Sequence, residues 1–149
     1  MTDRILVPID GSPLSWKALT LTLEEYPDAK IVALTVIDPT EPSYSVYGAD
    51  FEPEVEPLHG SEEWYDRHRE LVEELFEEVR DVASDHDVEL TTETGIGEPG
   101  RVIVDYAEEN GVDHVVLGSH GRDEDARILL GGVTESVAFR APVRVSLIR

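Results

Sequence analysis

The chain of 149 residues contains no cysteine. This absence excludes a disulfide framework, a cysteine nucleophile and a metal site built from thiolates. Long hydrophobic runs are missing too, because no apolar stretch approaches the roughly 18 residues that cross a bilayer. The opening segment MTDRILVPID has only a short apolar run and no small-residue cleavage pattern. We therefore expect one cytoplasmic domain, spanning residues 1–149, that does not enter a membrane.

Positive charge is also scarce. The sequence has 12 Lys and Arg residues against 33 Asp and Glu residues, a formal net charge of -21, and its two lysines are Lys17 and Lys30. Such a surface repels nucleic acid and anionic lipid, so we expect neither as a partner. A solvated acidic surface accounts for this charge in an ordinary protein. Abundant acids with few lysines are also typical of a halophilic protein, in which salt screens the self-repulsion.

Apolar runs and helical patterns alternate along the chain. The run IVALTVI is apolar without interruption, which is typical of a parallel strand that is covered on both faces. Strand and helix follow one another four times before a last strand, and this order predicts an open parallel α/β sheet with helices on both faces. Strands are predicted at 5–9, 31–37, 88–94, 114–117 and 143–148, and helices at 13–26, 64–84, 98–110 and 133–140.

Residues 38–63 break this alternation. The segment holds four prolines, with Tyr44, Tyr47 and Phe51 placed among acidic residues, and it has no sustained period. A long segment of this kind serves as a lid, an interaction loop or a linker, or it is a surface loop without a role.

Small and polar residues follow the first and fourth predicted strands. In open α/β sheets, ligands bind beyond the carboxyl ends of strands, where the strand order reverses. Asp10 follows the first strand, Gly118 and Gly121 follow the fourth, and Gly131 precedes the last helix, whose free N–H groups suit an anion. These glycines predict either a phosphate cradle or a structural turn. The chain has neither a P-loop nor G-x-G-x-x-G, which argues against a dinucleotide hydride-transfer enzyme.

Several segments together resemble the universal stress protein family. They are ILVPIDGS at the first strand, TVID at the end of the second, the pattern G-x2-G-x9-G with LLGGVTESV, and the closing APVRVSLIR. The resemblance covers essentially the whole chain. It implies a Rossmann-like fold of the adenine nucleotide alpha hydrolase type, for which we predict a five-stranded sheet in the order 3-2-1-4-5.

The ATP-binding branch of this family implies a nucleotide site here. By resemblance, Asp10 contacts the ribose, Val36 contacts the adenine through its backbone, and the glycine segment surrounds the phosphates. The cofactor is ATP or AMP, with Mg²⁺ or Mn²⁺ bridging phosphate oxygens rather than a metal held by protein ligands alone. The nucleotide-binding residues implied in this way are Pro8, Asp10, Val36, Leu117, Gly118, His120, Gly121, Arg122, Gly131, Gly132, Val133 and Thr134.

One position departs from the family's pattern. The family has Ser or Thr after the third glycine, where this chain has Gly132. The lost hydroxyl removes a hydrogen bond to a charged group, which contributes about 1.5–3 kcal/mol. Thr134 offers a partial replacement on the same helical turn, whereas Asp123, Glu124 and Asp125 repel phosphate. Two hypotheses therefore stand: a nucleotide-binding stress regulator, and a dimeric interaction module of the same family that no longer binds nucleotide.

Two residues are candidates for chemistry. Asp10 either contacts a ligand or bonds its own backbone in an Asx turn. His120 either contacts a phosphate, acts as a base or has a structural role. A phosphohydrolase needs a positioned base and a nucleophile or water, and Asp10 and His120 are the only candidates for these roles. We expect no enzyme and no catalytic residue, and at most slow ATP hydrolysis.

The last predicted strand begins at Val143 and ends at Ile148. Its apolar residues alternate with Arg144 and Ser146, which suits a strand at a sheet edge. The family commonly dimerises through this strand, so the resemblance implies a homodimer. The alternative is an edge strand that Arg144 protects from pairing.

Overall fold

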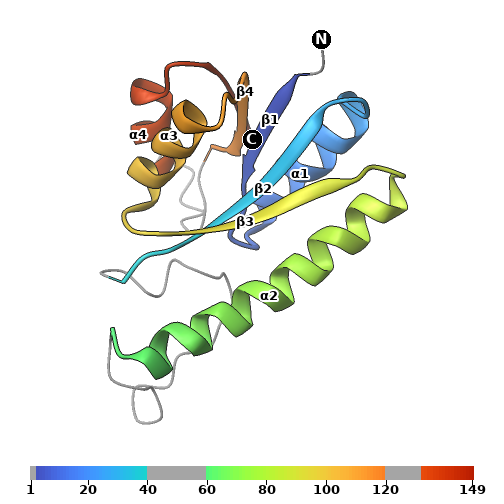
Figure 1. Ribbon diagram of the computed structural model, residues 1–149. Helices are drawn as coiled ribbons and strands as arrows, with labels where there is room; N and C mark the ends of the chain where they lie inside the picture. Colours follow the sequence, from blue (N-terminus) through green and yellow to red (C-terminus); the bar gives the residue numbers. More distant parts are fainter. Residues whose placement is uncertain (1–2, 40–59, 120–131) are drawn as a thin grey trace.

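The computed structural model describes residues 3–39, 60–119 and 132–149. Its centre is a parallel sheet of five strands in the order β3-β2-β1-β4-β5 (Figure 1). This confirms the predicted strand order. The elements of the described residues are β1 (Arg4–Pro8), α1 (Pro13–Glu25), β2 (Lys30–Ile37), α2 (Glu62–Asp85), β3 (Leu90–Ile96), α3 (Pro99–Glu109), β4 (His114–Gly118), α4 (Gly132–Arg140) and β5 (Arg144–Ile148).

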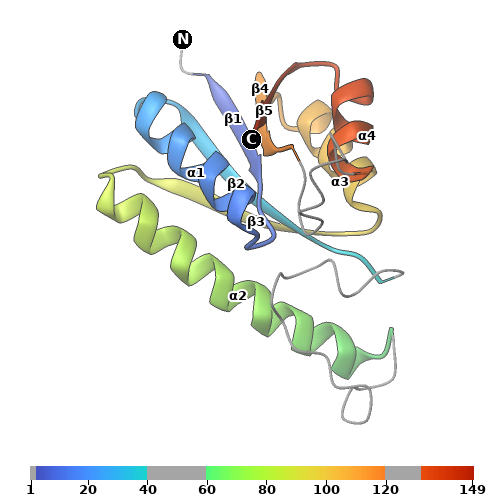
Figure 2. The ribbon, with the colours of Figure 1, turned by 180° about the vertical axis from the view of Figure 1, so that it is seen from behind.

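Helices cover both faces of the sheet. One face carries α1 and α2, and the other carries α3 and α4 (Figure 1, Figure 2). Successive residues of a strand point to opposite faces. Ile5 and Val7 of β1 therefore join the core under α1 and α2, whereas Leu6 joins the core under α3 and α4. Both cores bury aliphatic side chains that each contribute about 1.5–3 kcal/mol, which explains the uninterrupted apolar runs of the sequence.

The start of α2 differs from its predicted position. α2 begins at Glu62 rather than at residue 64, because the Ser61 side chain accepts a hydrogen bond of 3.2 Å from the Trp64 main-chain N–H. The irregular segment, predicted over residues 38–63, therefore ends at Ser61, directly before α2. Residues 40–59 of that segment lie outside the described residues, so its role as a lid or a linker stays a prediction.

The start of β3 also differs from its predicted position. β3 covers Leu90–Ile96 rather than residues 88–94. The cause is Val88, which is buried and whose N–H bonds to the Ala83 carbonyl at 3.0 Å, closing the end of α2. Val88 therefore belongs to the turn after α2, which alternation of apolar residues alone could not indicate.

Ser12 stands directly before α1 but does not cap that helix through its side chain. Its main-chain oxygen instead accepts from the Ser15 hydroxyl at 2.9 Å and from the Trp16 N–H at 3.1 Å. The first turn of α3 is capped by Glu98, whose two carboxylate oxygens accept main-chain N–H groups at 3.0 Å. Local hydrogen bonds thus fix both helix starts at the carboxyl edge of the sheet.

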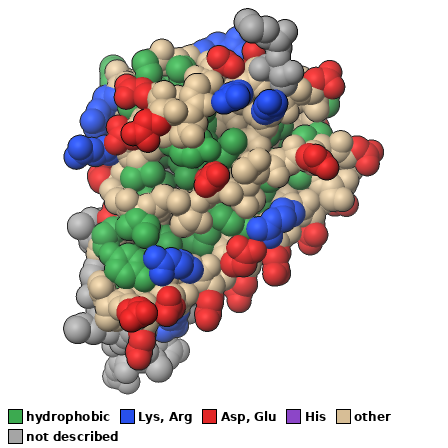
Figure 3. Space-filling model, in the orientation of Figure 1, with side chains coloured by type: hydrophobic (Ala, Val, Ile, Leu, Met, Phe, Trp, Pro, Cys, Tyr) green, Lys and Arg blue, Asp and Glu red, His purple; other side chains and the backbone are tan. Residues whose placement is uncertain are grey.

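The surface shows the charge imbalance of the sequence. Figure 3 shows acidic side chains gathered along α2 and apolar surface between α2 and the α3–α4 pair. Within the described ranges, no helix is long and apolar enough to cross a membrane.

Candidate functional site

The reversal of strand order at which the sequence predicts a ligand crevice lies between β1 and β4. These strands are parallel neighbours, with Ile5 opposite His114 and Leu6 opposite Val115. The chain leaves the carboxyl end of β1 toward β2 and that of β4 toward β5, so the strand order reverses between them. This is the position at which ligands bind in open α/β sheets.

Asp10 forms an Asx turn just beyond β1. Its Oδ1 accepts a hydrogen bond of 2.9 Å from the Ser12 main-chain N–H. Gly11 between them has a φ of 86°, which glycine adopts at little cost. The structural reading of Asp10 is therefore confirmed, and Oδ2 makes no hydrogen bond within the described part of the chain. The side chain is partly exposed.

Gly118 is packed against the first turn of α1. A Cβ added to Gly118 would lie 2.8 Å from Leu14 Cβ and 3.2 Å from the Leu14 carbonyl carbon. Only a residue without a side chain allows α1 to approach β4 this closely. The first glycine of the G-x2-G-x9-G pattern thus has a packing reason that is independent of any ligand.

The start of α4 is tied to the end of β4. The Thr134 hydroxyl donates to the Gly118 carbonyl at 2.7 Å, and Thr134 is buried. This bond holds the free N–H groups of the first α4 turn beside the crevice. Because the hydroxyl proton is engaged, it can replace the hydroxyl missing at Gly132 only by breaking this bond.

Gly132 itself has room for a side chain. A Cβ built there has no heavy atom within 4 Å, and its φ lies outside the left-handed region. Next to it, Val133 is 38% exposed at the beginning of α4. The departure from the family's Ser or Thr is therefore not imposed by packing.

The other predicted residues divide into two groups. Pro8 ends β1, while Val36 and Leu117 are buried near the ends of β2 and β4 in the core under α3 and α4. Their contact with a nucleotide stays a prediction. The remaining predicted residues lie outside the described ranges, and their roles stay predictions: His120, Gly121, Arg122 and Gly131.

The sequence reasoning missed a set of buried polar groups along this edge. The Thr35 hydroxyl donates to the Ile9 carbonyl at 2.8 Å, and the Ser119 N–H donates to the Ile148 carbonyl at 2.7 Å. Asp38, directly after β2, is only 4% exposed. Their positions in the sequence could have indicated their burial, because each of these polar residues lies within or directly after an apolar strand.

His114 is buried at the opposite edge of the sheet, away from the crevice. Arg144 Nη2 donates to its Nδ1 at 3.1 Å, so Nε2 carries the proton toward Ser146 Oγ at 2.7 Å. Burial lowers the pKa of His114, the Arg144 charge lowers it further, and Asp3 opposes them. The ring is therefore neutral and structural. Across the described ranges, no group of three His, Asp or Glu side chains could hold a metal.

The fold is that of a Rossmann-like α/β protein, with polar and glycine residues at the switch between β1 and β4. The model of the universal stress protein family matches residues 1–149. The chain therefore belongs to the universal stress protein family.

Individual relatives agree with this assignment. A universal stress protein of Methanocaldococcus jannaschii is 31% identical over 157 aligned residues, which cover 98% of this chain and 81% of the relative. The solved structure of universal stress protein UspA from Lactobacillus plantarum is 27% identical, with a TM-score of 0.73 and coverage of 99% of this chain and 97% of that chain.

More distant structures share the fold and were solved with nucleotides. A universal stress protein in complex with cAMP has a TM-score of 0.69 at 21% identity, covering 99% of this chain and 97% of that one. A family member from Arabidopsis thaliana with AMP bound has a TM-score of 0.59 at 18% identity, covering 98% and 90%. Some proteins of this fold thus bind adenine nucleotides.

Proposed function

We propose that this protein binds an adenine nucleotide, ATP or AMP, in the crevice between β1 and β4, and acts as a sensor or regulator in a stress response rather than as an enzyme. The observation that carries the proposal is the Thr134–Gly118 hydrogen bond of 2.7 Å. It sets the start of α4 beside β4, one strand away from the Asx turn of Asp10. The nucleotide complexes of proteins with the same fold support the choice of ligand.

Each part of the crevice suits one part of a nucleotide. Asp10 Oδ2 accepts from ribose hydroxyls, since Oδ1 is held by the Ser12 N–H. The main chain at Val36 offers donors and acceptors to the adenine. The free N–H groups and the positive dipole end of α4, beginning at Gly132, attract the phosphates. His120, Gly121, Arg122 and Gly131 complete the phosphate side in this proposal.

A divalent cation would arrive with the nucleotide. The described residues include no group of three metal-ligating side chains. Mg²⁺ is often held by substrate phosphates with only one or two carboxylates. We therefore propose that Mg²⁺ or Mn²⁺ neutralises phosphate charge, which matters on a chain with a net charge of -21.

The first test is nucleotide content. Protein purified in high salt is denatured, its supernatant is separated by ion exchange, and the emptied protein is titrated calorimetrically with Mg-ATP and with AMP. Co-purified nucleotide or micromolar binding is expected. A folded protein that yields no nucleotide and no heat would contradict the proposal. Phosphate release is followed in the same samples, and turnover that is abolished by Asp10→Asn would replace the regulator with a phosphohydrolase.

The position after the third glycine supplies a matched pair of variants. Gly132→Ser adds a hydroxyl donor where space is free, and the expected result is ATP binding that is tenfold to roughly a hundredfold tighter. Gly132→Ala adds the same Cβ without the hydroxyl and should bind ATP like the unmodified protein. Equal affinities for all three proteins would contradict the account of the missing contact.

A second candidate function is a dimeric interaction module without nucleotide. The engaged Thr134 hydroxyl favours it, because this hydroxyl is not free to replace the donor absent at Gly132. In both candidates we propose a homodimer joined through β5, whose Leu147 is 37% exposed at the sheet edge. Absence of nucleotide binding together with a stable dimer would select this alternative.

A further inference from the structure

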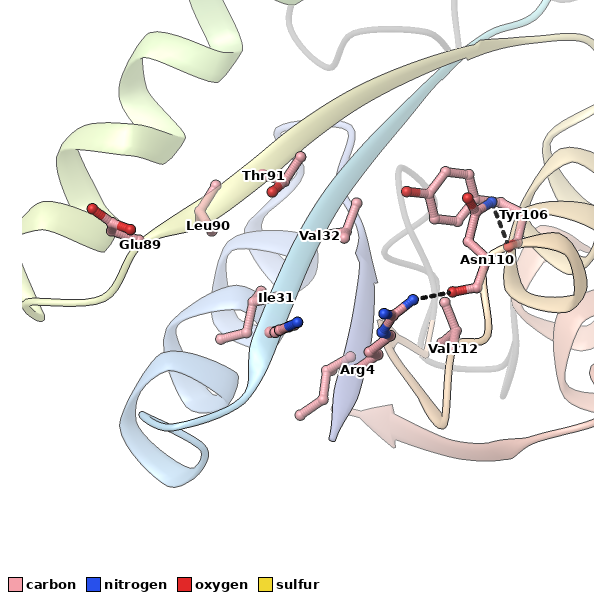
Figure 4. A pocket seen from close by; sticks show the side chains of 11 residues that line it. Arg4, Ile31, Val32, Glu89, Leu90, Thr91, Tyr106, Asn110 and Val112 are labelled. Carbon is pink, nitrogen blue, oxygen red and sulfur yellow. Dashed lines mark hydrogen bonds between the residues drawn. The ribbon is translucent and has the colours of Figure 1, made fainter. Parts of the chain in front are cut away.

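A cavity opens at the end of the sheet where β1, β2 and β3 begin (Figure 4). Its volume is about 430 Å³, within the range of small-molecule sites. The lining includes Arg4, Lys30, Val32 and Thr91 from the sheet and Tyr106 from α3. The proposed nucleotide site lies at the carboxyl ends of β1 and β4, so this cavity is a separate place on the molecule.

Two cations stand side by side at this cavity. Arg4 pairs directly with Lys30 in the register of β1 and β2. Both share a strand face with residues two positions later, Leu6 and Val32, which contact the core under α3 and α4. Both side chains are exposed, and their like charges repel each other. An arrangement of this kind gains stability from an anion.

Glu89 lines the same cavity, but within the described ranges no carboxylate forms an ion pair with Arg4 or Lys30, although acidic residues outnumber basic ones 33 to 12. The Arg4 guanidinium donates one hydrogen bond of 3.1 Å, to the Asn110 carbonyl. The carboxylate of Asp113 bonds instead to the Arg4 main-chain N–H at 2.9 Å. Other arginines do pair with carboxylates: Arg69 with Asp66, Arg80 with Glu73, and Arg101 with Asp105.

The rest of the cavity is amphipathic. Figure 4 shows the Tyr106 ring extending from α3 toward Val32, with Val112 near the Arg4 side. Burial raises the pKa of Tyr106, and the Glu93 charge raises it further. The phenol therefore stays protonated and can donate, and its hydroxyl makes no hydrogen bond within the part of the chain described. A ligand here meets an apolar wall, two cations, one hydroxyl donor and the Glu89 carboxylate.

We infer that this cavity binds a small organic monocarboxylate, with its carboxylate between Arg4 and Lys30 and its apolar body against Val32 and Tyr106. The planar guanidinium fork matches a carboxylate. A single negative charge suits the site better than a phosphate dianion, because Glu89 lines the same cavity. The inference does not depend on nucleotide binding in the crevice.

Glu89 places a negative charge at one side of the cavity. It directly precedes Leu90, the register partner of Ile31, and so continues the row of Arg4 and Lys30 on the third strand. Its carboxylate competes with a ligand for the Lys30 ammonium. Removing this charge by Glu89→Gln should therefore tighten carboxylate binding.

The test is a titration followed by ¹H–¹⁵N NMR, with phenylacetate as the probe and phenylacetamide as its neutral match. Phenylacetate should shift main-chain signals at the starts of β1 and β2 and at the end of α3. Its expected dissociation constant is about 1 mM. Phenylacetamide should bind at least roughly tenfold more weakly, since hydrogen bonds to a charged group are the stronger ones. Equal binding of acid and amide would overturn the inference.

Paired variants locate the site. Arg4→Gln with Lys30→Gln should weaken phenylacetate binding by about tenfold or more, whereas Arg101→Gln with Arg140→Gln changes the net charge equally and should leave it unchanged. Dispersed NMR spectra confirm that both double variants are folded, and Glu89→Gln provides a readout in the opposite direction. Loss of binding in both pairs, shifts confined to the crevice, or tighter binding of inorganic phosphate would each overturn the assignment.

Discussion

At the scale of the residue, Gly118 and Gly132 differ in whether packing requires a glycine. The approach of Gly118 to Leu14 leaves no room for a Cβ, whereas Gly132 in the same sequence pattern has open space. Gly118→Ala should therefore lower the free energy of unfolding by about 1–3 kcal/mol, as overpacking does. Gly132→Ala, the control, should leave stability unchanged or raise it by up to about 1 kcal/mol. Urea unfolding measures the stability of both variants. Equal stabilities would show that α1 can move away from β4 to make room for a Cβ at Gly118.

His114 gives the fold a pH dependence. Its pKa is lowered by burial and by Arg144, while Asp3 acts in the other direction and Tyr26 faces the ring edge-on at 5.7 Å. A pKa below the unfolded value means that folding favours the neutral ring. This stabilisation is complete above the unfolded pKa of about 6.5 and is lost as the pH falls through the folded pKa.

The comparison that isolates this effect uses His114→Gln. Acidification also relieves repulsion among the carboxylates, so the informative quantity is the stability of the unmodified protein minus that of the variant. This difference should shrink between about pH 7 and pH 5. A constant difference would mean that His114 titrates alike in the folded and unfolded chains.

At the scale of the element, the two edge strands offer a controlled test of the dimer. Leu147 on β5 is 37% exposed and Ile96 on β3 is 48% exposed. If β5 joins two copies, Leu147→Lys should convert the dimer to a monomer in sedimentation velocity, because it places charge in an apolar contact. Ile96→Lys makes the same change at the other edge and should remain dimeric. The reverse result would assign the interface to β3.

Elements were predicted well from the sequence where pattern alone determines them. Uninterrupted apolar strands and the strand–helix alternation are local signals, and they fixed the order of the elements. The start of β3 was wrong because Val88 bonds to Ala83 in the turn after α2. The engagement of the Thr134 hydroxyl by Gly118 could not be predicted either, since that contact joins residues 16 positions apart through the tertiary fold.

The net charge acts on the molecule as a whole. With a formal charge of -21, the folded chain repels itself, and salt shortens the range of that repulsion from about 10 Å at 0.1 M to about 3 Å at 1 M. We expect the melting temperature to rise by several degrees over this range of KCl, in keeping with the proposed halophilic adaptation. A neutral osmolyte at equal osmolality is the control. A flat response to KCl would remove salt adaptation as the reason for the acidic surface.

The division of the core between two sheet faces bears on how the chain emerges from the ribosome. The buried residues of the core under α1 and α2 lie between Ile5 and Val88, apart from Val116, and the partly buried Leu90 and Ile148 pack against them. That half can assemble while the remainder is still being made. The opposite face of β1 and β2, with Leu6 and Leu34, has to wait for α3 and α4. At about 5–20 residues per second, an apolar surface stays uncovered for several seconds. A fragment ending at Gly97 should therefore be helical yet self-associate, which light scattering would detect.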